Sequence, residues 1–138
     1  IKIYNKSINL IDESYNASPQ TMRVCIEYFS NLKLNPNQKK ILILGEMKEL
    51  GANAIKFHIK LLNYLLEKKL EHVIICGELM QIALKKTGNR KILCMMDLKS
   101  ILEYINKNIC EKDIILVKGS NSSLTNILTK KLLSFGEN

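Results

Sequence analysis

Several polar side chains that suit a hydroxylated or phosphorylated ligand crowd one short segment near the start of the chain. They lie between the apolar run 8–11 and Pro19, and they are Asp12, Glu13, Tyr15 and Asn16. Ser18 followed by Pro19 is a typical N-cap and first helical residue, so a capped turn explains those two residues. It does not explain the two carboxylates, the phenol and the carboxamide. At a junction of strand and helix, such groups can bind hydroxyls, while the free N–H groups of the helix can bind phosphates.

Two further segments place glycine and polar side chains where an apolar run ends. The segment 44–51 reads Leu-Gly-Glu-Met-Lys-Glu-Leu-Gly, and Glu46 and Lys48 are its candidate ligand-binding residues. The segment 117–123 follows the last apolar run and contains Lys118, Gly119, Ser120 and Asn121. A lysine and backbone N–H groups beside a helix N-terminus can bind a carboxylate or a phosphate. Glycine turns with serine caps and solvated acids remain the alternative interpretation of both segments.

Signatures of several common sites are missing from the sequence. It contains no G-x-G-x-x-G after an apolar run and no G-x-x-x-x-G-K-[ST], so it lacks the usual phosphate-binding loops. His58 and His72 have no serine or cysteine partner at a spacing typical of hydrolases. His58 is therefore either a half-buried structural histidine or a ligand contact. The four cysteines form no C-x-x-C pair, so we expect no metal site, and free thiols fit a reducing cytoplasm.

The formal net charge of +8 raises the question of nucleic-acid binding. Only Arg23 and Arg90 among the 21 basic residues are arginines, the lysines are spread along the chain, and aromatic residues make up 6%. Nucleic-acid-binding surfaces usually group arginine with stacking aromatics. The composition therefore favours a lysine-rich solvated surface and no nucleic-acid partner, although the charge can attract an anionic substrate. No apolar run approaches the roughly 20 residues of a membrane span, so we expect no membrane partner.

Short apolar runs alternate with stretches of helical periodicity along the whole chain. The runs are 8–11, 41–44, 73–76, 92–96 and 114–117. Most are continuous rather than alternating, which is typical of strands buried on both faces of a parallel sheet. Asp97 and Gly88 are expected to start and end helices, and residues 1–4 to pair with 8–11 as an edge hairpin. We expect one α/β domain over residues 1–138, with a Rossmann-like, doubly wound, mostly parallel sheet of about five or six strands and helices on both faces. The three polar segments should then meet at one edge of the sheet.

The motifs in these segments resemble the C-terminal domain of the Mur ligase family. Members show D-D-S-Y-N-A-N-P-x-S-M after a strand, then L-G-D-M-x-E-L-G, a histidine in the next helix, and L-V-K-G-S late in the domain. The corresponding positions here are 12–22, 44–51, His58 and 116–120. They occur in the family order and span nearly the whole chain.

The resemblance implies an ATP-dependent amide ligation in peptidoglycan biosynthesis. It implies that UDP-N-acetylmuramoyl-tripeptide is phosphorylated to an acyl phosphate, which the amine of D-alanyl-D-alanine then attacks. ATP and Mg²⁺ would be bound mainly by a central domain and the uridine nucleotide by an N-terminal one, neither of which is in this sequence. The chain would be the C-terminal domain of a cytoplasmic three-domain enzyme, inactive on its own, that serves cell-wall biogenesis, cell shape and cell division.

The same resemblance suggests which residues meet ATP. Asp12 and Glu13 match a segment that contacts the ribose, and a carboxylate that accepts from ribose hydroxyls is a common arrangement. Which of the two meets the ribose stays open, because Glu13 replaces a family aspartate. Tyr15 and Asn16 match residues near the adenine, where a ring can stack and a carboxamide can pair with a base edge.

A second group of residues is expected near the incoming dipeptide, and no catalytic residue is expected in this domain. The group consists of Lys118, Gly119, Ser120, Glu46 and Lys48. The first three match a loop close to the incoming amino acid in related ligases. His58 and Asn121 have uncertain roles; Asn121 stands where many members have arginine, and 125–126 where many have Met-Glu.

Two other function classes remain open from the sequence alone. A receiver-like phospho-acceptor domain would suit the acids 12–13 and Lys118. That site also needs an aspartate at the end of a middle strand, where Leu44-Gly45 and Cys76-Gly77 stand instead. The third possibility is an interaction module that binds no nucleotide.

Overall fold

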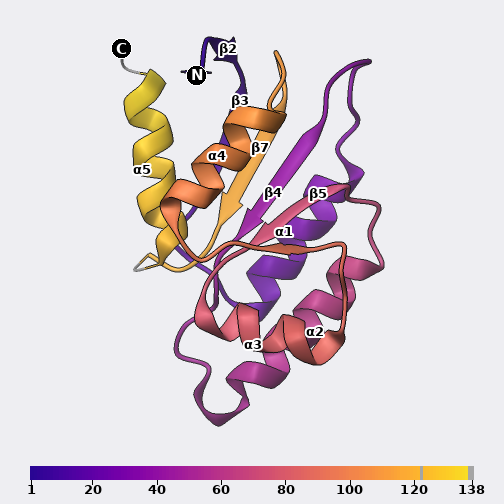
Figure 1. The fold of residues 1–138 in the computed structure, drawn as a ribbon. Helices are drawn as coiled ribbons and strands as arrows, with labels where there is room; N and C mark the ends of the chain where they lie inside the picture. Colours follow the sequence, from indigo (N-terminus) through magenta and orange to yellow (C-terminus); the bar gives the residue numbers. More distant parts are fainter. Residues whose placement is uncertain (122, 137–138) are drawn as a thin grey trace.

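The computed structural model describes residues 1–121 and 123–136, which form a five-stranded parallel sheet covered by helices on both faces (Figure 1). The strands of this sheet are β3 (Asn9–Glu13), β4 (Lys40–Leu44), β5 (His72–Ile75), β6 (Leu93–Cys94) and β7 (Ile114–Lys118). The helices are α1 (Pro19–Asn31), α2 (Ala54–Leu66), α3 (Glu78–Thr87), α4 (Leu98–Asn108) and α5 (Leu124–Gly136), and a short 3-10 helix η1 (Gly51–Asn53) precedes α2. The expected fold class is confirmed.

A separate hairpin precedes the sheet. Strands β1 (Lys2–Ile3) and β2 (Lys6–Ser7) pair antiparallel across Tyr4 and Asn5, whose φ angles of 48° and 65° are those of a two-residue hairpin turn. Ile1 and Ile8 add two backbone hydrogen bonds of 2.8 and 2.9 Å. The expected pairing of residues 1–4 with 8–11 is wrong beyond Ile8, because this tight turn sets a shorter register and β3 pairs with β7 instead.

The strand order β3-β7-β4-β5-β6 places β7, the last strand in the chain, between β3 and β4. Helices α1, α2 and α3 cover one face of the sheet, and α4 and α5 cover the other (Figure 1). The chain therefore leaves β3 and β4 toward one face and β7 toward the opposite face. Such a topological switch point opens a crevice at the carboxyl ends of the strands.

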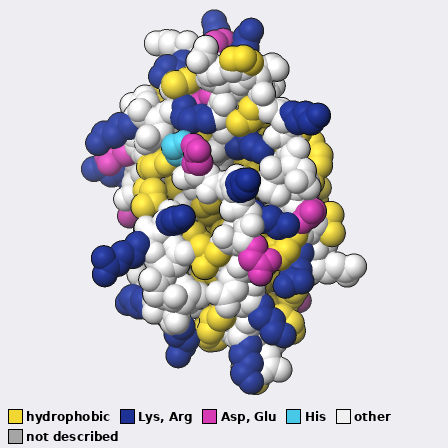
Figure 2. Space-filling model, turned by 90° about the vertical axis from the view of Figure 1, so that its right-hand side faces the viewer, with side chains coloured by type: hydrophobic (Ala, Val, Ile, Leu, Met, Phe, Trp, Pro, Cys, Tyr) yellow, Lys and Arg dark blue, Asp and Glu magenta, His cyan; other side chains and the backbone are white. Residues whose placement is uncertain are grey.

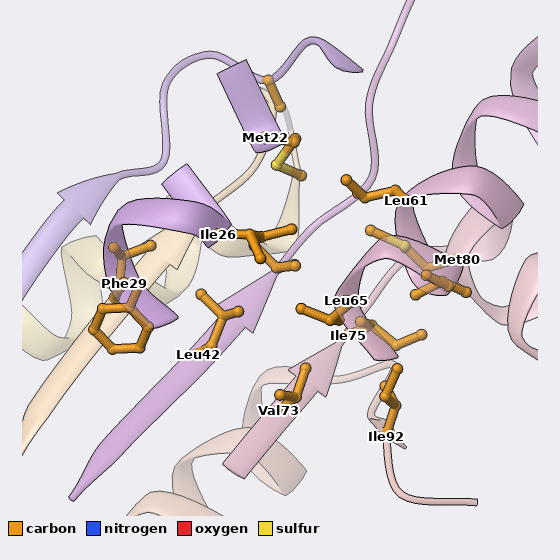
Figure 3. Close-up of a cluster of buried hydrophobic side chains, with 14 of the residues drawn as sticks. Met22, Ile26, Phe29, Leu42, Leu61, Leu65, Val73, Ile75, Met80 and Ile92 are labelled. Atoms are coloured by element: carbon orange, nitrogen blue, oxygen red, sulfur yellow. The ribbon is translucent and has the colours of Figure 1, made fainter. Parts of the chain in front are cut away.

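Each strand face supplies its own hydrophobic core, which explains the continuous apolar runs. In β4, Leu42 and Leu44 belong to the cluster under α1–α3, while Ile41 and Ile43 belong to the cluster under α4 and α5. Figure 3 shows the first cluster, whose labelled side chains come from α1, β4, α2, β5 and α3 and from one residue just before β6. Its labelled side chains are Met22, Ile26, Phe29, Leu42, Leu61, Leu65, Val73, Ile75, Met80 and Ile92. A strand buried on both sides leaves no position for a polar residue until it ends, so polar groups concentrate at the strand ends.

The helix ends follow the sequence signals. Ser18 accepts a hydrogen bond from the Thr21 backbone N–H at 3.1 Å, and Asp97 accepts one from the Ser100 N–H at 2.8 Å. Helix α3 ends at Thr87, and the C-cap residue after it, Gly88, has a left-handed conformation. The predicted helix starts at Pro19 and after Asp97 are thus confirmed.

The surface agrees with the composition. On the face shown in Figure 2, lysine and arginine side chains are spread among apolar and acidic ones rather than gathered in one patch. Within residues 1–121 and 123–136, none of the helices combines the length and the apolar character that a membrane crossing requires.

Candidate functional site

The three polar segments meet at the carboxyl ends of β3, β7 and β4, an edge called the rim below. Glu13 and Leu44 both pair with Lys118, one from each side, and the Gly45 N–H donates to the Lys118 carbonyl at 2.7 Å. The segments that follow these strands therefore start side by side. This confirms the expected convergence, and it occurs at the switch point, where α/β sheets bind their ligands.

A groove of about 470 Å³ opens between α1 and β3 beside the rim and is called the α1–β3 groove below. Its apolar floor and walls include Ile11, Val24, Cys25, Tyr28 and Leu116. Its polar lining consists of Glu13, Tyr15, Asn16, Gln20, Thr21 and Lys118. Three of the four residues expected at ATP thus share one concave surface, whereas Asp12 is not part of its lining. An apolar floor with a few polar groups at one end is typical of small-molecule sites.

The two neighbouring carboxylates have different surroundings. Asp12 Oδ1 accepts hydrogen bonds from the Ser14 N–H at 3.0 Å and from the Ser14 hydroxyl at 2.5 Å. The same hydroxyl lies 2.8 Å from Thr129 Oγ1 of α5. Asp12 therefore stabilises the turn after β3. Glu13 lines the groove, and its negative charge raises the pKa of the Tyr15 phenol.

Lys118 and Gly119 end β7 in a crowded position. Only 4% of Lys118 is exposed, and its ammonium group donates to the Asn16 carbonyl at 2.8 Å. A Cβ atom on Gly119 would lie 2.1 Å from Thr125 Oγ1 of the buried Thr125 side chain. Position 119 therefore has room for glycine only, and the chain can turn tightly from β7 toward α5.

Ser120 presents an unusual hydroxyl. The residue is 8% exposed. In the part of the chain that the structure describes, every other buried side-chain oxygen or nitrogen has a hydrogen-bond partner, whereas Ser120 Oγ has none. Its carbonyl, by contrast, accepts from the Ser123 hydroxyl at 2.5 Å. Buried hydroxyls are nearly always paired, so this orphan group is suited to a ligand. Asn121 is exposed beside it.

Glu46 and Lys48, on the β4 side of the rim, interact with the protein itself. Glu46 Oε2 accepts from the Leu79 N–H at 2.9 Å in the first turn of α3, and Lys48 lies 3.1 Å from Oε1. Gly77 permits this approach: its φ is +107°, and a Cβ there would lie 2.8 Å from Glu46 Oε2. Glu46 therefore caps a helix, and its role near the dipeptide stays a prediction, as does that of Lys48.

His58 is fully buried and connects the loop after β4 to α2. Its Nε2 accepts from the Met47 N–H at 3.0 Å, so Nδ1 carries the proton and donates to the Ala54 carbonyl at 2.7 Å. Burial lowers the pKa of the imidazole, partly offset by the Ala54 carbonyl and the charge of Glu46. Of the two interpretations of His58, these contacts favour the structural one.

Some residues around the site were not predicted from the sequence. Thr125 and Thr129 lie on α5 and contact the two rim loops, yet hydroxyls in a helix give no signal of that role. Val24 and Tyr28 did carry a signal. They are exposed apolar residues four positions apart, on the side of α1 away from its buried stripe.

No group of three or more histidine, cysteine, aspartate or glutamate side chains that could hold a metal ion occurs among the described residues. The described side chains therefore form no cluster that would bind a metal ion by itself, whereas Mg²⁺ usually binds through one or two carboxylates together with substrate phosphates. The receiver-like alternative gains no support, because β4 and β5 lead into Gly45 and Cys76-Gly77 rather than into an aspartate.

Comparison with known proteins places the chain in a family. The family model described as "Mur ligase, glutamate ligase domain" matches residues 2–121. The UDP-N-acetylmuramoyl-tripeptide–D-alanyl-D-alanine ligase of Bacillus subtilis is 28% identical over 133 residues, which cover 94% of this chain and 29% of that protein. The enzyme of the same name from Rickettsia prowazekii is 31% identical over 121 residues, covering 86% and 26%.

Solved structures agree with these relatives. The MurF ligase from Thermotoga maritima in complex with ADP superposes with a TM-score of 0.76 at 26% identity, covering 96% of this chain and 29% of that one. MurF from Acinetobacter baumannii gives a TM-score of 0.77 at 25% identity, with the same coverage. The chain spans less than a third of the length of these relatives. From the family model and these matches together, the chain belongs to the Mur ligase family and corresponds to its glutamate ligase domain.

Proposed function

We propose that this chain is the C-terminal domain of an ATP-dependent ligase that joins D-alanyl-D-alanine to UDP-N-acetylmuramoyl-tripeptide. Relatives that carry the name of this activity match nearly the whole chain but are more than three times as long. The observation that carries the proposal is the α1–β3 groove beside the orphan Ser120 hydroxyl at one switch point. The enzyme would act in the cytoplasm, in peptidoglycan synthesis and hence in cell-wall biogenesis, cell shape and cell division.

The α1–β3 groove is the proposed nucleoside site. The exposed ring of Tyr15 can stack on adenine, and the Asn16 carboxamide can pair with a base edge. Glu13 lines the groove, whereas Asp12 is engaged in its turn, so Glu13 is the better acceptor for ribose hydroxyls. The sequence has no phosphate loop, so another domain would hold the phosphates of ATP together with Mg²⁺.

The start of α5 is the proposed site for the carboxylate of the dipeptide. Ser120 offers a buried hydroxyl without a partner in the described chain, and Gly119 brings the backbone close. The positive end of the α5 dipole favours an anion there. On the other side of the rim, Lys48 is half-exposed and can reach the same ligand only if it leaves Glu46.

The proposed reaction has two steps. The tripeptide carboxylate attacks the γ-phosphorus of ATP, which forms an acyl phosphate and releases ADP. The dipeptide amine then attacks the acyl carbon, loses a proton and expels inorganic phosphate as the amide bond forms. This domain contributes binding and orientation to both steps, and such positioning is a large part of the catalysis of bimolecular reactions.

The test is ligation by the full-length protein. Incubation with ATP, Mg²⁺, the nucleotide-linked tripeptide and D-alanyl-D-alanine should give the pentapeptide product, ADP and phosphate in equal amounts. The 138-residue chain alone should show no ATP turnover and only weak ATP binding. No product from the full-length protein, or a stable phosphoprotein instead, would refute the proposal.

A further inference from the structure

The turn after β3, residues 14–17, is called the nucleotide loop below, and within the described residues its long-range hydrogen bonds come from one region. Lys118 donates to the Asn16 carbonyl at 2.8 Å, Asn126 Nδ2 to the Ser14 carbonyl at 3.4 Å, and Thr129 Oγ1 lies 2.8 Å from Ser14 Oγ. All three partners lie between residues 118 and 129, on β7 and α5. The loop proposed to hold the nucleoside is therefore held by the segment proposed to hold the dipeptide.

Lys118 makes the only charge-assisted bond of the three. Side chains alternate along β7, and Leu116 and Lys118 both line the α1–β3 groove. The lysine stem thus runs under α1, and its ammonium reaches a carbonyl 102 residues away in the sequence. Hydrogen bonds from charged donors are about twice as strong as neutral ones, and a buried ammonium that lost its acceptor would be costly.

We propose that Lys118 is a positioning residue that holds the nucleotide loop through the Asn16 carbonyl, rather than a direct ligand of the dipeptide. The inference rests on the proposed function for its kinetic consequences. Its structural basis is independent of that function: a residue only 4% exposed, engaged with a main-chain carbonyl, in the strand between β3 and β4. Through this bond, movement of the segment after β7 displaces Tyr15 and Asn16 as well, so occupancy of one site affects the other.

The experiment compares Lys118→Met with Lys118→Arg in the full-length ligase. Methionine keeps a flexible apolar stem and removes the donor, whereas arginine keeps a charged donor. For Lys118→Met we expect the KM for ATP to rise about tenfold, the effect of one lost charge-assisted hydrogen bond, and the KM for the dipeptide to change less than about threefold. Lys118→Arg should recover most of the ATP affinity.

Two matched controls sharpen the comparison. Asn16→Ala removes the side chain but keeps the main-chain carbonyl, so the loop should stay attached. Lys130→Met removes an exposed lysine from α5 and should leave both KM values unchanged.

Amide hydrogen exchange in the ligand-free enzyme gives a readout that does not depend on activity. We expect exchange in residues 14–18 to accelerate about tenfold in Lys118→Met, but not in Asn16→Ala or Lys130→Met, because only the first frees the loop. A raised dipeptide KM with an unchanged ATP KM would identify Lys118 as a direct ligand and overturn the proposal. Unchanged exchange in the loop, or acceleration throughout β4 and β7, would overturn it too. Failure of the wild type to ligate would refute the proposed function alone.

Discussion

The two halves of the rim use similar residues in different ways. On the β3 side, Glu13, Tyr15 and Asn16 face the α1–β3 groove. On the β4 side, Glu46 caps α3 and pairs with Lys48. His58 holds the loop between β4 and η1 by accepting from the Met47 N–H, and its other ring nitrogen donates to Ala54 within α2. Both segments looked like ligand sites in the sequence. The difference shows that an acid beside a glycine at a strand end can equally stabilise the neighbouring helix.

The two sides of the rim differ in what they must do for the fold. The β4 side has to be rigid, because its loop connects the central strand to α2 and α3. The β3 side lies at the edge of the sheet, where a groove can open without exposing the core. Substitutions on the β4 side should therefore affect stability, and those on the β3 side should affect nucleotide binding.

The largest effect is expected for His58→Ala. The substitution leaves a cavity and removes the acceptor of the Met47 N–H, so the free energy of unfolding should fall by about 3 kcal/mol. Urea denaturation of the 138-residue chain measures it. Lys56→Ala, at an exposed position of the same helix, should cost less than about 0.5 kcal/mol.

The pH dependence of this chain tests the same residue. Burial lowers the pKa of His58 in the folded state below its ordinary value of 6.5, so below that pH the unfolded chain binds a proton that the folded chain does not. The contribution of His58 is therefore complete above pH 6.5 and declines as the pH falls through the folded-state pKa. His58→Ala should lack this decline, and an equal decline in both proteins would contradict the assignment.

A smaller loss is expected for Gly119→Ala. The new methyl group would lie 2.1 Å from Thr125 Oγ1, and overpacking of this kind costs about 2 kcal/mol. The double variant with Thr125→Ala removes the obstructing hydroxyl and should be less destabilised than the sum of the two single variants. Simple additivity in denaturation measurements would argue against this contact.

The most direct test of the comparison pairs Glu46→Ala with Glu13→Ala. Loss of the α3 cap should cost about 1 kcal/mol of stability in Glu46→Ala. Glu13→Ala should change stability by less than about 0.5 kcal/mol and, in the full-length ligase, raise the KM for ATP about tenfold. The reverse pattern would invert the roles of the two sides of the rim.

The smallest effect concerns the phenol of Tyr15. The charge of Glu13 raises its pKa above the ordinary 10.0, so in Glu13→Ala the pKa should fall back toward that value. Ultraviolet titration, with Tyr15→Phe as the reference that identifies the signal, measures the difference. An unchanged titration would place the Glu13 carboxylate away from Tyr15.

Much of the fold could be predicted because burial on two faces leaves a clear pattern. The continuous run 41–44 and the capping pair Ser18-Pro19 gave a strand and a helix start without ambiguity. The run 92–96 was less well predicted. Only Leu93–Cys94 form a strand, because β6 lies at the edge of the sheet, where strands are often very short, so the length of an apolar run does not give the length of the strand. The predicted pairing of residues 1–4 with 8–11 was wrong because the register of a hairpin depends on its turn, and the pattern of apolar residues contains no information on the type of turn.

The amino-acid sequence by itself determined the class of fold, the segments that reach the rim and the family to which they point. It did so because apolar runs, capping residues and the order of motifs can all be recognised in the sequence without knowledge of distant contacts. Only the tertiary structure separated Glu13 from Asp12, gave His58 and Glu46 their internal partners and brought Lys118 to Asn16. Those relations join residues up to 102 positions apart. Whether a carboxylate or an ammonium is available to a ligand depends on neighbours that only the folded chain brings into contact.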